Sequence, residues 1–124
     1  MEVDDFIKYI ESNDVLTGKF EFPRNENLMG LDFVNKTFVD FELKGGDFAS
    51  GAFINCTFDR VLFEDLALVA VNFTNCHFVN CKLSQIESSF GLDNCRVDSF
   101  VVVYVLPQDE ASQAILDALE KVKK

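Results

Sequence analysis

Large apolar residues recur at every fifth position through the middle of the chain. The series holds one register for twelve units and contains only Phe and Leu. Helices repeat about every 3.6 residues and strands every two, so neither element explains a period of five. The array therefore specifies an architecture of its own. The twelve positions are Leu28, Phe33, Phe38, Leu43, Phe48, Phe53, Phe58, Phe63, Leu68, Phe73, Phe78 and Leu83.

A second, generally smaller residue stands two positions before the large one, such as Gly51 before Phe53 and Cys56 before Phe58. Over residues 26–106 this pattern resembles the pentapeptide-repeat family. The resemblance implies an all-β fold, a right-handed quadrilateral β-helix of about four coils. Both residues of each pair would face inward, and positions twenty apart would stack about 4.8 Å apart on successive coils.

The register changes once, after Leu83. Position 88 is Ser, and the stripe resumes one residue early at Leu92, Val97 and Val102. When a one-residue deletion is allowed after Leu83, two further columns align. They are Asn35, Asn55, Asn75 and Asn94, and Lys36, Cys56, Cys76 and Cys95. Because two independent columns agree, we expect a local irregularity near residues 86–89 in an otherwise continuous coil.

The segments that flank the repeats are expected to cap the coil. In residues 1–25, apolar residues at helical spacing predict a helix over 2–12, and Phe20 and Phe22 predict a short strand that ends at Pro23. Residues 107–124 predict a second helix over 109–123. We therefore expect one domain over residues 1–124, with helices that protect its open ends. The quinolone-resistance branch of the family implies that the C-terminal helix could also form a homodimer.

Charge and composition restrict the partners and the compartment. The 124-residue chain has a net charge of −10, which disfavours direct contact with nucleic acid or an anionic membrane surface. No apolar run approaches the roughly 20 residues of a membrane span. The acidic start of the chain lacks the pattern of a secretory signal. We expect a cytoplasmic protein.

The sequence contains no catalytic or metal-binding pattern, so we expect neither an enzyme nor a cofactor. His77 is expected to face outward while Cys76 and Cys81 face inward, so these three cannot bind one metal ion. The four cysteines are expected to be reduced core residues, because stacked coils separate them more than a disulfide prefers. Lys36, at the foot of the cysteine column, is expected to reach water at the open end of the coil.

The outer surface is therefore where we look for function. Outward positions along one side are nearly free of charge, and such an apolar strip usually contacts something. The predicted partner-binding residues are Met29, Asp32, Ala49, Ala52, Ile54, Val69 and Ala70. The alternative is that the N-terminal helix covers this strip through Phe6, Ile7 and Ile10.

Two functions fit this surface. The first is a non-enzymatic module that binds another protein through its rigid faces, such as an antagonist or immunity protein. The second is implied by the quinolone-resistance branch, whose members mimic duplex DNA and bind type II topoisomerases. Its candidate residues are the acids on the opposite side, Asp40, Glu42, Asp59, Glu64 and Asp65. We favour the binding module, because a mimic needs negative potential on both sides.

Overall fold

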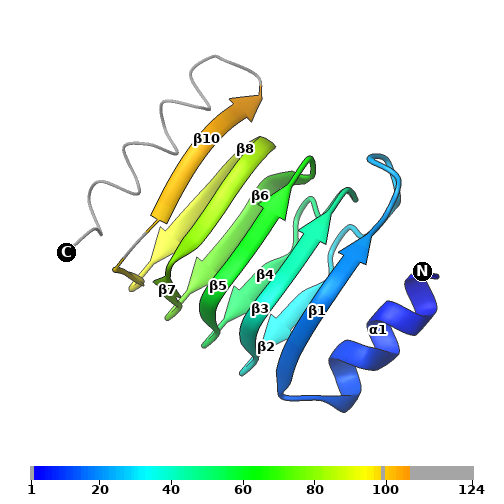
Figure 1. Cartoon of the computed structure of the whole chain (residues 1–124), viewed down its shortest axis with the longest axis horizontal. Helices are drawn as coiled ribbons and strands as arrows, with labels where there is room; N and C mark the ends of the chain where they lie inside the picture. The colour runs from blue at the N-terminus through cyan, green and yellow to red at the C-terminus, as the bar shows by residue number, and fades with distance from the viewer. Residues whose placement is uncertain (1, 99, 107–124) are drawn as a thin grey trace.

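The chain winds into a parallel β-solenoid of about four turns, preceded by one helix (Figure 1). The computed structural model describes residues 2–98 and 100–106, apart from the side chains of residues 87–90 and 100–106. The predicted helix at 109–123 lies outside the described residues. The elements are α1 (Val3–Ser12), β1 (Val15–Glu21), β2 (Asp32–Val34), β3 (Thr37–Lys44), β4 (Ala52–Ile54), β5 (Thr57–Glu64), β6 (Ala67–Thr74), β7 (His77–Val79), β8 (Cys81–Asp93), β9 (Arg96–Val97) and β10 (Phe100–Leu106).

Parallel pairing at an interval of twenty residues holds successive turns together. Phe33 of β2 pairs with Phe53 of β4, which pairs in turn with Phe73 of β6. Their rings stack with centroids 4.5 and 4.7 Å apart, close to the spacing of neighbouring strands. All twelve residues of the Phe and Leu stripe are at most 4% exposed. The predicted inward stripe is therefore confirmed.

The backbone bends at every fifth residue, two positions after each large apolar residue. A positive φ recurs at intervals of five from Gly30 to Gln85 and again at Asn94. Gly, Asn and Asp adopt this left-handed conformation most readily, and they occupy most of these positions. The exceptions are Ser50, Arg60, Ala70 and Gln85.

The register changes by one residue within β8, as predicted. Val69 of β6 pairs with Ser89, but Phe73 pairs with Leu92, so the interval falls from twenty to nineteen. The new interval persists, because Phe78 pairs with Val97. The side-chain amide of Asn94 accordingly donates to the Asn75 oxygen in the turn before. The strand itself continues from Cys81 to Asp93 through the irregularity.

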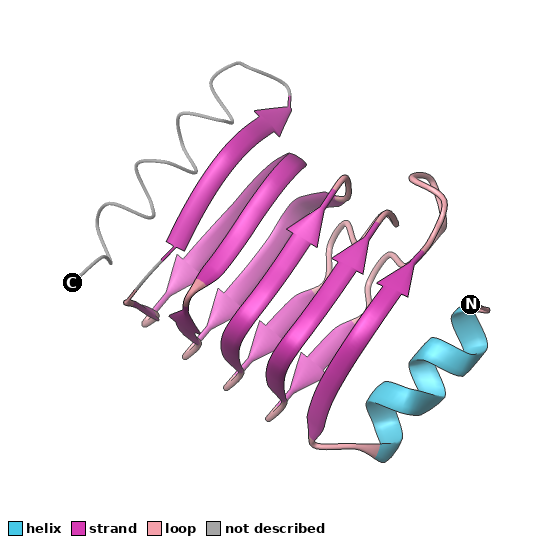
Figure 2. Cartoon of the chain, viewed as in Figure 1, coloured by secondary structure: helices cyan, strands magenta, loops and turns pink. Residues whose placement is uncertain are grey.

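The N-terminal segment closes one end of the solenoid, where the cyan helix lies beyond the last magenta strand in Figure 2. β1 pairs with β3, and it begins at Val15, earlier than the sequence predicted. Phe6 of α1 is fully buried, with its ring centroid 5.2 Å from those of Phe20 and Phe22. The Tyr9 hydroxyl also donates to the Thr17 carbonyl at 3.0 Å. The predicted helix over 2–12 is confirmed, and it packs against the end of the coil.

Nowhere in the described chain is there a helix of the length and apolarity that a bilayer crossing requires.

Candidate functional site

The seven predicted partner-binding residues lie together along one side of the solenoid. In the ladder between β2 and β4, Asp32 pairs with Ala52. At the neighbouring bend, the Gly30 amide donates to the Ala49 carbonyl, and the Ser50 amide donates to the Val69 carbonyl, both at 2.9 Å. These bonds place the outward residues of three turns in adjacent columns. We call the set Met29, Asp32, Val34, Ala49, Ala52, Ile54, Val69 and Ala70 the apolar strip.

Three apolar side chains of the strip are exposed to solvent. Met29 is 56% exposed, Val34 46% and Val69 38%. Since α1 buries Phe6 and Ile10 against the end of the coil, it does not cover these three residues. The alternative in which the N-terminal helix covers the strip is therefore wrong for Met29, Val34 and Val69.

The strip is also almost free of charge. On three successive turns of this side, segments 27–35, 47–55 and 67–75 contain no Lys or Arg and only two acids, Asp32 and Asp47. The Asp47 carboxylate accepts a hydrogen bond from the Ala49 amide at 3.0 Å, so it serves the local bend. Asp32 is exposed and forms no ion pair with any described residue. Within these three segments, Asp32 is therefore the acid that remains available at the rim of the strip.

Ala70 adopts an unfavourable backbone conformation in the middle of the strip. Its φ is 58°, at the bend where the turns below have Gly30 and Ser50. An alanine in this left-handed region is disfavoured by roughly 1–2 kcal/mol, because its Cβ approaches the following carbonyl. Strain of this kind often accompanies a functional surface. The Ala70 side chain is thus an exposed methyl group at a position where most other bends have Gly, Asn or Asp.

Bases of the same chain partly neutralise the alternative acidic face. Arg60 Nε lies 2.6 Å from Asp40 Oδ1, and this hydrogen bond holds the pKa of the Asp40 carboxyl below its usual value. Arg60 also pairs with Asp59 at 3.1 Å. The remaining pairs are Lys19 with Glu42 at 3.9 Å, Lys44 with Glu64 at 3.9 Å and Arg24 with Asp65 at 3.4 Å. All five predicted acids thus face a base, which weakens the potential that a DNA mimic needs.

The cysteine column points into the core, as predicted. Cys56 and Cys76 of this column, and Cys81 of another column, are free thiols with at most 5% exposure. Each donates to a carbonyl of the preceding turn, for example from Cys76 Sγ to the Phe53 oxygen at 3.3 Å. Cys95 is different, because it ends the column and is only half-buried. Its hydrogen bond with the Cys76 thiol lowers the Cys95 pKa to about 7.

Lys36 does not reach an open end of the coil, so that expectation is wrong. Its side chain is 12% exposed, and Nζ donates to the Asn13 carbonyl at 2.7 Å. The Asp14 carboxylate lies 3.8 Å away. The connection between α1 and β1 closes this end and supplies the polar partners that a buried ammonium requires.

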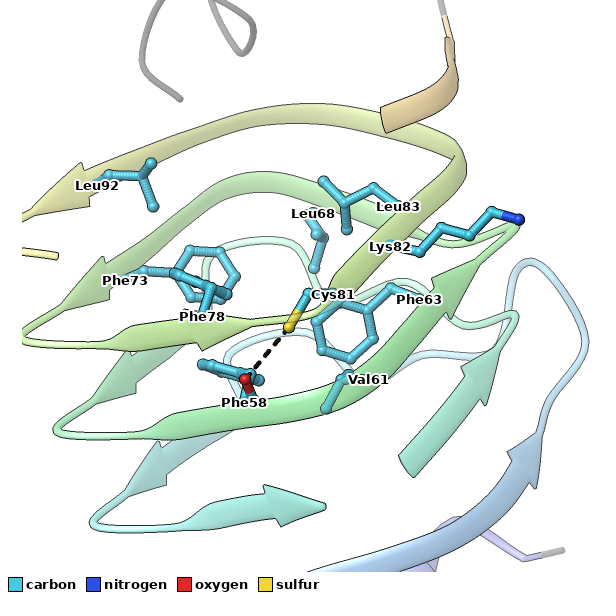
Figure 3. A pocket seen from close by; sticks show the side chains of 10 residues that line it. All are labelled: Phe58, Val61, Phe63, Leu68, Phe73, Phe78, Cys81, Lys82, Leu83 and Leu92. Atoms are coloured by element: carbon cyan, nitrogen blue, oxygen red, sulfur yellow. Dashed lines mark hydrogen bonds between the residues drawn. The ribbon is translucent and has the colours of Figure 1, made fainter. Parts of the chain in front are cut away.

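A small internal cavity lies where the Phe stacks give way to smaller residues (Figure 3). Leu92 follows Phe73 in its column, and Leu83 follows Phe63 in the next. The lining is apolar except for the Cys81 thiol, which donates to the Phe58 carbonyl, and Lys82, whose ammonium points away. Among the described lining residues, no polar group is placed to orient a substrate.

The described residues contain no group of three or more His, Cys, Asp or Glu side chains that could hold a metal ion. His77 faces outward as predicted, with Nε2 2.5 Å from Asp98 Oδ2. This contact holds the pKa of the Asp98 carboxyl below its usual value. It joins β7 to the turn that follows β9, so it links two turns at the surface.

Neither the protein-family models nor the curated proteins contain a match to this chain.

The left-handed bends were not predicted from the sequence, although their signal is visible there. Gly, Asn and Asp recur two positions after the large apolar residue, which makes Ala70 conspicuous as an exception.

Proposed function

We propose that this chain is a protein-binding module whose apolar strip docks on a partner protein, as an antagonist or immunity protein does. The observation that carries the proposal is the uncovered strip itself, which exposes Met29, Val34 and Val69 along a side without a single base. Apolar surface supplies most of the affinity in such contacts, while acids at the rim, such as Asp32, act on encounter and orientation.

The scaffold is, in this proposal, a pentapeptide-repeat coil that is right-handed and quadrilateral. The twenty-residue turn and the left-handed residue at every fifth position support that form. Parallel pairing on every turn makes such a coil rigid, so the strip is presented with little conformational entropy to lose on binding.

The experiment compares three variants in capture of the partner from a native cell extract, followed by affinity measurement. Val69→Asp should leave the fold intact, because the side chain points outward, and weaken binding at least tenfold by placing a charge in an apolar contact. Val15→Asp is the matched control, since Val15 is 57% exposed but lies on β1, away from the strip.

The third variant neutralises Asp40, Glu42, Asp59, Glu64 and Asp65 together. Loss of binding in this variant, with binding retained in Val69→Asp, would replace the proposal with the DNA mimic. If Val69→Asp unfolded the chain instead, the strip would be an internal seam and the site would be wrong.

A further inference from the structure

The first turn of the solenoid is paired along only part of its N-terminal edge. β1 lies beside β3, from the pair Val15 and Thr37 to the pair Glu21 and Lys44. On the adjoining side, β2 is the last strand of the described sheet, and it pairs with β4 alone. No strand therefore lies beside β2 in the way that β1 lies beside β3.

Backbone groups of β2 are directed toward this edge, where no strand pairs with it. The Ala52 amide donates to the Leu31 carbonyl at 3.4 Å, and the Asn35 amide donates to the Ile54 carbonyl at 2.9 Å. A parallel ladder alternates the side on which successive residues bond, so Asp32 and Val34 turn their N–H and C=O groups the other way. These four groups form no hydrogen bond within the described residues.

The side chains along this edge specify what would fit it. Two stacked pairs on neighbouring turns join a base with an acid, namely Lys19 with Glu42 and Lys44 with Glu64. A base beside Asp32 would form the same arrangement. Val34 is 46% exposed, whereas Ile54 one turn above is half-buried, so an apolar side chain fits beside Val34.

The residue between these two must be small. It would point inward below Phe33, which is only 1% exposed although no strand lies beneath it. The space under that ring is therefore already filled by the protein.

We propose that β2 accepts an extended segment of the partner protein as an added parallel strand, with a basic, a small and an apolar residue in succession. This inference rests on the proposed function, because the added strand would extend the apolar strip by one turn. Main-chain hydrogen bonds supply affinity in strand addition, and the alternating side chains supply specificity.

The test uses a synthetic peptide with Arg-Gly-Val at its centre and Thr residues on both sides, titrated to millimolar concentration into the ¹⁵N-labelled full chain. We expect chemical-shift changes centred on Asp32 to Asn35 and slower hydrogen exchange of the Asp32 and Val34 amides. Val34→Pro removes one outward N–H without touching the ladder to β4, so it should weaken the peptide at least tenfold. Shifts that centre elsewhere, or a Val34→Pro chain that binds as tightly as wild type, would overturn the proposal.

A charge exchange gives a second arm that does not depend on the folding of the proline variant. A peptide with Glu in place of Arg should not bind the wild-type chain but should bind Asp32→Lys. Equal binding of both peptides to both chains would also refute the proposed register.

Failure here can be told apart from failure of the proposed function. Val69→Asp lies on the third turn and should leave peptide binding unchanged. If the partner requires Val69 while the peptide does not bind β2, the strip stands and strand addition is wrong. If the peptide binds while no partner depends on Val69, the proposed docking surface is wrong.

Discussion

Phe33 and Phe53 stack almost parallel, with ring centroids 4.5 Å apart and an angle of 3° between the ring planes. The two residues occupy the same position of successive turns, so their backbones and side chains repeat one conformation. The stack continues to Phe73, and the neighbouring column of Phe38, Phe58 and Phe78 does the same. Stability thus depends on rings that touch across turns.

Phe53→Ala is expected to lower the free energy of unfolding by about 3–5 kcal/mol, because it removes the ring that joins two others and leaves a cavity. Chemical denaturation measures the change. Phe53→Leu, which keeps most of the volume, should cost less. Unchanged stability of Phe53→Ala would contradict the buried stack.

Ala70→Gly is expected to raise the free energy of unfolding by about 1 kcal/mol, since Gly relieves the left-handed strain. Ala49→Gly is the matched control. Ala49 is also on the strip but has no positive φ, so the added backbone freedom should destabilise it. Thermal denaturation distinguishes the two, and equal effects would show that the bend stores no strain.

Cys95 is expected to react with iodoacetamide in native buffer long before the other three cysteines. Alkylation requires the thiolate, and the Cys95 pKa is lowered to about 7, so its rate should rise with pH through that value and then level off. Burial raises the Cys81 pKa to about 11, so Cys81 should stay unlabelled until the chain unfolds. Mass spectrometry after timed labelling assigns the site, and Cys95→Ser should remove the fast phase. Rapid labelling of Cys81 would contradict this arrangement.

Leu92→Phe is expected to stabilise the fold by about 0.5–2 kcal/mol, because a ring at this position extends the Phe73 column into the cavity. Leu92→Ala should act in the opposite direction. Denaturation of both variants measures the effect, and destabilisation by the larger side chain would show that the cavity cannot accept a ring.

The coil and its core could be predicted because the apolar period and the side-chain volumes carry that information directly. The register slip was predictable too, since Asn94 and Cys95 each rejoin a column. The partner of Lys36 was not, because it is the Asn13 carbonyl, and a main-chain acceptor leaves no trace in the sequence.

For the candidate site, the sequence predicted which residues point outward but not whether anything covers them. An amphipathic helix shows only that one of its faces is buried, so the apolar face of α1 fitted the strip and the coil end equally well. The ion pair between Asp40 and Arg60 could have been predicted from the sequence, because the two residues are twenty positions apart and therefore stack. Lys19 with Glu42 required the register of β1, which no repeat specifies.

The pairing of each turn with its neighbours alone governs how the molecule is expected to respond to force. Each turn is joined only to the turns before and after it, and the paired positions are separated by nineteen to twenty-three residues throughout. When the chain is pulled from its ends, we therefore expect its turns to unfold one at a time. The force that starts this process depends on the terminal turn and not on the length of the coil.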